Sequence, residues 1–211
     1  MQKLLILLTV FFFSYAASAL AAEPAGYVAG KDYSLITPIQ PTDTVDKLEV
    51  VEIFWYGCPH CHQFEPTLGP WTKDLPEDVG FYRLPAIFSP LWEVHARAYF
   101  TADILNVLDE SHSALFHVLH VKRKKLSTLE KLADFYVQYG VDKALFEKTY
   151  HSFVVNTRVA RAKEMVTRYG VEGVPAMVVN GKYLITGPMA KSYENMLRIT
   201  DFLLAKERAL K

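Results

Sequence analysis

The sequence predicts an α/β fold in which a central mixed β-sheet is flanked by helices and interrupted by a helical insertion. Short apolar runs typical of strands occur in both the first and the last third of the chain. Between them, the segment from Pro90 to Tyr150 has helical periodicity. The pair Asn180-Gly181, which lies between two further apolar runs, is the strongest short signal for a β-hairpin.

The first part of the chain predicts strands around one helix. We expect strands at 33–36, 48–55 and 79–84, and a helix from Cys58 to about Trp71. Pro66 and Pro70 lie within this helix, and because proline lacks an N–H, we expect them to kink or end it.

The last part predicts a helix, a hairpin and a helix. Apolar residues at helical spacing recur from Val155 to Tyr169, and Gly170 is expected to end this helix. Strands are expected at 176–179 and 182–185, and a final helix carries Met196, Ile199 and Leu203.

The N-terminus has the layout of a secretory signal peptide, predicted for residues 1–22. Lys3 precedes an apolar run from Leu4 to Phe13, and small residues follow it. The alternative is a membrane anchor, but the apolar core is short and no basic stop-transfer segment follows. The remaining chain divides into 23–86, a helical insertion at 87–151, and 152–211. Export would place the protein in an oxidising compartment.

Cys58-Pro59-His60-Cys61 contains the only two cysteines of the chain. The pair follows a predicted strand and begins a predicted helix, where free backbone N–H groups and the helix dipole favour a thiolate at Cys58. A disulfide across so short a loop stabilises the fold little, so the pair is better explained by reactivity. The sequence therefore indicates thiol–disulfide chemistry.

Charge and histidine patterns indicate no nucleic-acid partner, metal or cofactor. The net charge is zero, and nothing favours nucleic acid. We interpret the basic run 122–125 as a solvated helix end. His112, His117 and His120 are interpreted as surface or boundary residues, because a metal site needs three or four converging ligands.

Several motifs together resemble the thioredoxin fold and, within it, the DsbA family of periplasmic oxidases. The resemblance covers nearly all of the chain after residue 22. It is carried by Cys58-Pro59-His60-Cys61, Phe64-Glu65, Ser152-Phe153-Val154-Val155, Gly173-Val174-Pro175-Ala176-Met177 and Val179-Asn180-Gly181-Lys182-Tyr183. One departure is His62, where members of the family often have another aromatic residue. The family is an established example of a lowered cysteine pKa and of an oxidising disulfide.

The motif residues predict distinct roles at the cysteine pair. Cys58 is the candidate nucleophile, and Cys61, one turn into the helix, is the resolving thiol of a redox-active disulfide. His60 would stabilise the Cys58 thiolate, unless it is only an exposed turn residue. Pro59 suits an early helical position. The resemblance implies that Glu52 assists proton transfer; the alternative is a solvated glutamate at a sheet edge.

The resemblance also implies where a substrate binds. It predicts a cis Val174-Pro175 bond facing the cysteine pair, with the Val174 backbone pairing with an extended client. Phe88 and Trp92 would either line a substrate groove or pack as core or lid residues.

The predicted function is that of a periplasmic dithiol oxidase that donates the Cys58–Cys61 disulfide to newly exported, unfolded proteins. The resemblance implies re-oxidation by a quinone-linked membrane partner of DsbB type. One alternative is a c-type cytochrome, because Cys58-x-x-Cys61-His62 also fits haem attachment. The other is a disulfide isomerase of the same fold. Isomerases carry an added N-terminal dimerisation domain, and the short segment 23–32 favours a monomeric oxidase.

Overall fold

The computed structural model describes residues 26–44 and 46–210. The signal peptide predicted for residues 1–22 lies outside the described residues. Within the described part of the chain, no helix has the length and apolar character needed to cross a membrane.

A five-stranded mixed sheet forms the centre of the fold, in the order β1-β5-β4-β2-β3. β2 pairs parallel with β3 and antiparallel with β4, while β5 pairs antiparallel with both β4 and β1. The strands are β1 Ser34–Leu35, β2 Leu48–Phe54, β3 Val79–Pro85, β4 Ala176–Val179 and β5 Tyr183–Thr186. Every residue of β2 is buried, because both faces of this inner strand are covered.

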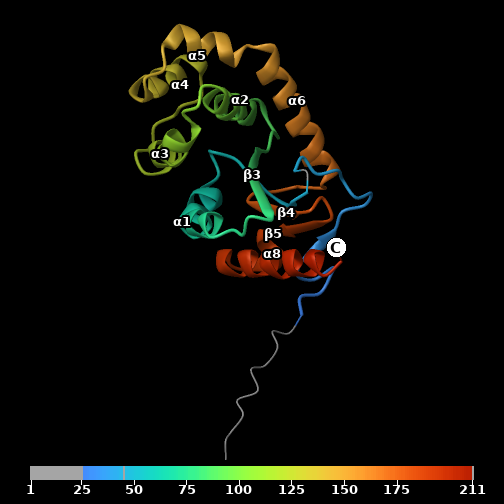
Figure 1. Cartoon of the computed structure of the whole chain (residues 1–211). Helices are drawn as coiled ribbons and strands as arrows, with labels where there is room; N and C mark the ends of the chain where they lie inside the picture. The colour runs from blue at the N-terminus through green and yellow to red at the C-terminus, as the bar shows by residue number, and fades with distance from the viewer. Residues whose placement is uncertain (1–25, 45, 211) are drawn as a thin grey trace, which may run out of the picture.

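The helices separate into two groups (Figure 1). Helices α2 to α5 gather at one end of the molecule, the sheet and α8 occupy the other, and α6 runs between them. Their bounds are α1 Pro59–Lys73, α2 Pro90–Ile104, α3 Leu108–His120, α4 Leu129–Tyr136, η1 Val137–Tyr139, α5 Lys143–Tyr150, α6 Phe153–Arg168, α7 Gly187–Ala190 and α8 Tyr193–Arg208. A helical insertion thus lies between β3 and β4. The boundaries at 86 and 151 stay a prediction.

Of the two expected effects of the prolines in α1, a kink or an end of the helix, the second was wrong. The helix does not end at Pro66 or Pro70 but continues to Lys73. Phe64 and Leu68 are buried in the core on either side of Pro66, and this packing outweighs the local loss of backbone hydrogen bonds.

Two apolar clusters lie on the two faces of the sheet. Val51 and Ile53 of β2 belong to the cluster formed with the helical insertion. Leu48 and Val50 belong to the other cluster, which contains Phe64 of α1 and residues of α8. Side chains alternate between faces along a strand, so the consecutive residues Val50 and Val51 contribute to different cores.

The hairpin between β4 and β5 follows the sequence signal. Asn180 and Gly181 have φ of 50° and 62°, as a type I′ turn requires. A Cβ at Gly181 would lie 2.1 Å from the Gln40 carbonyl oxygen. Only glycine therefore fits at this position.

Candidate active site

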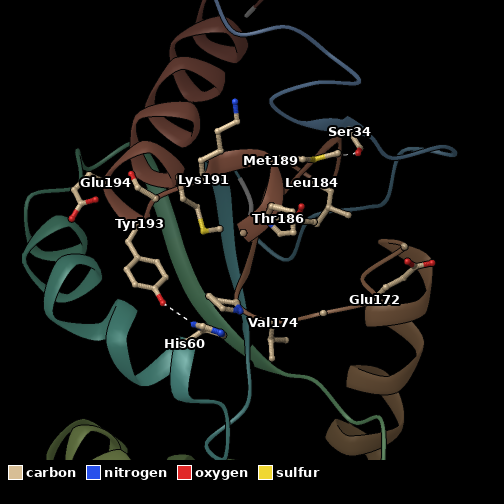
Figure 2. Close-up of a pocket in the computed structure, with 17 residues that line it drawn as sticks. Ser34, His60, Glu172, Val174, Leu184, Thr186, Met189, Lys191, Tyr193 and Glu194 are labelled. Atoms are coloured by element: carbon tan, nitrogen blue, oxygen red, sulfur yellow. Dashed lines mark hydrogen bonds between the residues drawn. The ribbon is translucent and has the colours of Figure 1, made fainter.

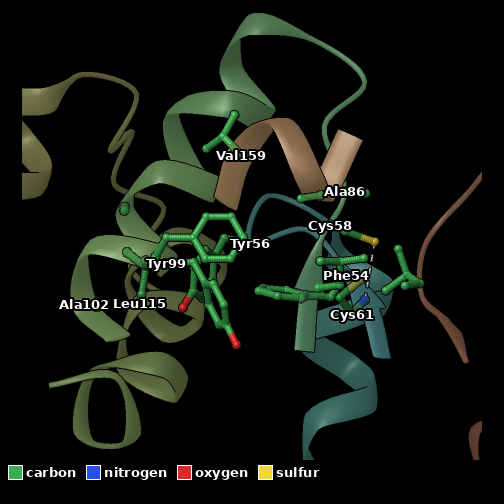
Figure 3. Close-up of a cluster of buried hydrophobic side chains, with 14 of the residues drawn as sticks. Phe54, Tyr56, Cys58, Cys61, Ala86, Tyr99, Ala102, Leu115 and Val159 are labelled. Atoms are coloured by element: carbon green, nitrogen blue, oxygen red, sulfur yellow. Dashed lines mark hydrogen bonds between the residues drawn. The ribbon is translucent and has the colours of Figure 1, made fainter. Parts of the chain in front are cut away.

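The cysteine pair lies at the start of α1, directly after β2. Cys58 is the N-cap residue, Pro59 occupies the first turn, and the Cys61 N–H donates to Cys58 Sγ at 3.4 Å (Figure 3). Gly57 forms the turn between β2 and α1. A Cβ at this position would lie only 2.3 Å from Cζ2 of Trp55, so a larger residue would clash with the Trp55 ring. Both cysteines are free thiols, so the structure describes the reduced form.

The Cys58 thiol is acidic because several donors point at its sulfur. Its pKa is lowered to about 6, first by a hydrogen bond from the Cys61 thiol. Burial opposes this effect, the backbone N–H groups of Cys61 and His60 add to it, and the charge of His60 contributes least. A lowered pKa makes Cys58 a thiolate over most of the neutral range and a good leaving group.

Cys61 has the opposite character. It is fully buried, whereas Cys58 is 6% exposed. Burial, followed by the neighbouring Cys58 sulfur, raises the pKa of the Cys61 thiol far above its ordinary value. The two sulfurs therefore differ in both access and acidity, and only Cys58 is suited to meet a partner thiol.

His60 is exposed and contacts a residue that sequence reasoning did not identify. Its Nδ1 lies 3.3 Å from the hydroxyl of Tyr193 at the start of α8 (Figure 2). The same hydroxyl donates to Gln63 Oε1 at 3.2 Å, and the Tyr193 ring stacks on Phe64. Tyr193 thus ties the active-site turn to α8, a contact that no sequence signal revealed.

Val174 and Pro175 lie beside Cys58. Their peptide bond is cis, and the Cys58 thiol contacts the Val174 carbonyl oxygen at 3.5 Å. Both residues line a cleft of about 1120 Å³, together with His60 and Tyr193 (Figure 2). The structure therefore brings the predicted substrate-binding residues and the cysteine pair together.

Glu52 is fully buried in β2 and is not at a solvated edge. Its Oε2 accepts from Arg83 Nε at 2.8 Å, while Oε1 has no hydrogen-bond partner among the described residues. Burial raises the pKa of Glu52 to about 8; Arg83 counteracts this effect, and Glu65 adds to it. The charge of Glu52 in turn raises the pKa of Cys61.

A chain of polar contacts continues from Arg83 to the helical insertion. Arg83 Nη2 lies 3.3 Å from both Glu65 carboxylate oxygens, His112 Nε2 lies 3.3 Å from Glu65 Oε1, and His112 Nδ1 lies 2.8 Å from the Tyr56 hydroxyl. Burial lowers the pKa of His112. A neutral ring then accepts from Tyr56 and donates to Glu65.

These polar contacts correct the interpretation of His112 as a surface or boundary residue. It is buried because α3 packs against α1 and presents it to Glu65. The sequence contained only weak signals for these residues. Glu65 belongs to the Phe64-Glu65 motif, and Arg83 interrupts an apolar strand just as Glu52 does.

Aromatic side chains cover the other side of the cysteine loop. Trp92 stacks on Trp55 with ring centroids 4.2 Å apart, and Phe88, which is 47% exposed, packs on Trp92. His62 stacks on His120 at 4.9 Å. Among the described residues, no group of three histidine, cysteine or acidic side chains is placed to hold a metal ion.

Similarity to known proteins identifies the family. The model of the DSBA-like thioredoxin domain matches residues 80–198. The Thiol:disulfide interchange protein DsbA of Pseudomonas aeruginosa is 43% identical over 204 residues, which are 97% of each chain. The chain belongs to the DsbA family. The DsbA of Azotobacter vinelandii is 41% identical over 212 residues, 99% of each chain.

Solved DsbA structures have the same fold. The crystal structure of Pseudomonas aeruginosa DsbA matches with a TM-score of 0.83 and 46% identity, over 87% of this chain and 96% of that one. That of Xylella fastidiosa DsbA matches with a TM-score of 0.83 and 38% identity, over 87% and 98%.

Membership of the DsbA family confirms the predicted thioredoxin fold with a helical insertion. The protein is a thiol:disulfide oxidoreductase. The relatives match over almost their entire length, and this decides for a DsbA-type enzyme over the c-type cytochrome and the isomerase.

Proposed function

We propose that this protein is a periplasmic dithiol oxidase that transfers the Cys58–Cys61 disulfide to exported, unfolded proteins. The observation that carries the proposal is the contrast between the two sulfurs. Cys58 has a pKa of about 6, whereas Cys61 is buried with a raised pKa. A low pKa of the attacked sulfur stabilises the dithiol form and makes the disulfide oxidising.

In the first step, a client thiolate attacks Cys58 Sγ of the oxidised enzyme. The Cys58–Cys61 bond breaks, a mixed disulfide forms between the client and Cys58, and Cys61 leaves with the electron pair. Because its pKa is raised, Cys61 must take up a proton. Glu52, with a pKa of about 8, holds a proton at neutral pH and supplies it.

In the second step, another client thiolate attacks the client sulfur of the mixed disulfide. Cys58 leaves as a thiolate, which the Cys61 N–H and thiol stabilise. The client gains a disulfide, and its two electrons remain on the Cys58/Cys61 dithiol. If the second client thiol reacts slowly, Cys61 attacks the Cys58 sulfur of the mixed disulfide instead. The Cys58–Cys61 disulfide then forms again, and the client is released as a thiol.

The cleft beside Cys58 receives the client chain. The backbone of Val174 pairs with an extended segment, which gives affinity without sequence preference. Pro175 directly precedes β4, which begins at Ala176, and Pro59 starts α1 where its missing N–H costs nothing. The electrostatic effect of His60, together with its backbone N–H, lowers the pKa of Cys58 and so favours the thiolate.

The enzyme reaches the periplasm by way of the signal peptide at residues 1–22 and acts there as a monomer. A quinone-linked membrane protein of DsbB type removes the two electrons and restores the disulfide. Incubation of reduced enzyme with quinone-containing bacterial membranes tests this step; enzyme that stays reduced would contradict it. Light scattering of the mature chain tests the oligomeric state.

The central test is the redox equilibrium of the Cys58/Cys61 pair against glutathione. We expect a couple more oxidising than glutathione, and rapid oxidation of a reduced, unfolded client with one cysteine pair. Cys58→Ser should abolish transfer, while Cys61→Ser should leave one reactive thiol that forms stable adducts. His60→Ala should raise the pKa of Cys58 only slightly, because the Cys61 contacts remain. A couple as reducing as an ordinary structural disulfide would overturn the proposal.

A further inference from the structure

A second hollow reaches the cysteine loop from the side of the helical insertion. It has a volume of about 600 Å³, and it shares no lining residue with the cleft at Val174. The cleft meets the loop through His60, whereas this hollow meets it through Gly57 and Pro59. Cys58 therefore lies between two openings, and a client chain crossing it can extend into either.

The second hollow is lined by basic side chains and by no acidic ones. Arg123, Lys124 and Lys125 form part of its wall, and all three are exposed. Within the described part of the chain they form no ion pair of the kind found for Arg97 or Arg158. We call the hollow the basic groove, defined by Arg123, Lys124 and Lys125 with Trp55, Gly57, Pro59, Leu91, His95, Leu119, His120, Leu126 and Ser127.

The fold holds the basic loop in place over the groove. Lys124 N–H donates to the Val118 carbonyl of α3 at 3.0 Å. Leu126 is buried, and its carbonyl oxygen lies 3.0 Å from His95 Nε2. The loop is therefore anchored on both α3 and α2, so its cationic side chains start from an ordered backbone.

We propose that the basic groove binds acidic segments of client proteins next to the cysteine that reacts with Cys58. This inference rests on the proposed oxidase function. Clustered cations beside a reacting centre raise the local concentration of anionic partners and their association rate. Clients with aspartate or glutamate close to a cysteine would thus be oxidised faster than neutral ones, although the cleft at Val174 accepts both.

The test compares three synthetic peptides, each with one pair of cysteines flanked by aspartate, asparagine or lysine. Stopped-flow oxidation by the disulfide form gives the second-order rate constant for each. At low ionic strength we expect the acidic peptide to react about tenfold faster than the neutral one, and the basic peptide to react slower than the neutral one. Raising the salt to about 0.5 M should remove most of the difference, because the Debye length then falls to about 4 Å.

The variant Arg123→Gln/Lys124→Gln/Lys125→Gln tests the groove itself. It should lose the preference for the acidic peptide and keep the wild-type rate with the neutral peptide. The control Lys31→Gln/Lys73→Gln/Arg198→Gln removes the same charge from exposed residues outside the groove. It should keep most of the preference, because these charges act only through the net charge of the protein.

Each outcome separates the two proposals. Failure of the wild type to oxidise even the neutral peptide would overturn the oxidase function. Oxidation of all three peptides at equal rates, or an equal loss of preference in both variants, would overturn the groove proposal alone. If the groove variant oxidises the acidic peptide normally but is re-oxidised slowly by bacterial membranes, the groove binds the re-oxidant and the proposal fails.

Discussion

Two glutamates on β2 are equally buried and yet have different surroundings. Glu49 and Glu52 both have 0% exposure, and the alternation of side chains places them on opposite faces of the strand. Glu49 Oε2 accepts from the backbone N–H groups of Asp43 and Thr44 at 2.6 and 3.0 Å. The Tyr82 hydroxyl lies 3.5 Å from its other oxygen.

Glu52 has far fewer donors. Arg83 is its one hydrogen-bond donor among the described residues, and Oε1 has none. Its pKa is raised to about 8, and it influences the cysteine pair. A buried carboxylate with donors on both oxygens holds a loop in place, whereas one with an unpartnered oxygen can exchange a proton. The following predictions, from the largest effect to the smallest, test this distinction.

Arg83→Met should have the largest effect. It removes the cation between Glu52 and Glu65, and the free energy of unfolding should fall by about 3 kcal/mol, because breaking a buried pair leaves its partners uncompensated. The charge left uncompensated is that of Glu65, because Glu52, with a pKa of about 8, already holds a proton at neutral pH. The control is Arg208→Met, whose pair with Asp78 lies at the surface and contributes about 1 kcal/mol or less. Equal losses in urea unfolding would contradict the prediction.

Glu49→Gln should lower the free energy of unfolding by about 2 kcal/mol, because the N–H groups of Asp43 and Thr44 lose a charged acceptor. The pKa of Cys58 and the rate of client oxidation should not change. Chemical denaturation and a thiolate titration measure the two properties. A change in the Cys58 titration would mean that Glu49 also belongs to the active site.

Glu52→Gln should have the opposite effects to Glu49→Gln: the free energy of unfolding should rise, and client oxidation should slow. The pKa of the carboxyl is raised from 4.5 to about 8 in the folded state. Between these values the unfolded chain ionises while the folded protein keeps its proton, so the free energy of unfolding of the wild type falls as pH rises. The variant lacks this titration and should therefore gain roughly 2 kcal/mol relative to wild type between about pH 5 and pH 7.

The same Glu52→Gln variant should oxidise clients at least about tenfold more slowly, since the leaving Cys61 loses its proton source. Rapid-quench measurement of the mixed disulfide detects this step. Full activity with an altered stability profile would reduce Glu52 to a structural role like that of Glu49.

The smallest expected effect is a difference in stability between the reduced and the oxidised protein. The pKa of Cys58 is lowered from 9.0 to about 6 in the folded protein. The stability contributed by the thiolate is complete above pH 9.0 and is lost as pH falls to about 6. At about pH 7 the reduced form should be more stable than the oxidised form by about 1 kcal/mol from this source. Melting curves of both forms measure it, and Glu49→Gln should leave the difference unchanged. A difference that persists well below pH 6 would point to another cause.

Much of the local structure was predictable from the sequence, because short-range chemistry determines it. Asp142 caps α5 and Ser152 caps α6 through side-chain contacts three residues ahead. Gly170, with φ of 70°, follows the end of α6. The cysteine pair at the first turn of α1 was equally evident, because a strand, a turn and a helix start can each be recognised from neighbouring residues.

Only the tertiary structure decided what surrounds the cysteine pair. Arg83 is 31 positions from Glu52, and His112 is 47 from Glu65 and 56 from Tyr56. Nothing in the local sequence of β3 or α3 indicates these partners. The basic run 122–125, interpreted from sequence as a solvated helix end, is indeed exposed, but Arg123, Lys124 and Lys125 also line a groove beside Cys58. The sequence by itself determined where the chain turns and which sulfur begins the helix, since these depend on adjacent residues. Burial, pKa and the convergence of charges depend on packing between distant segments, and only the folded chain specifies them.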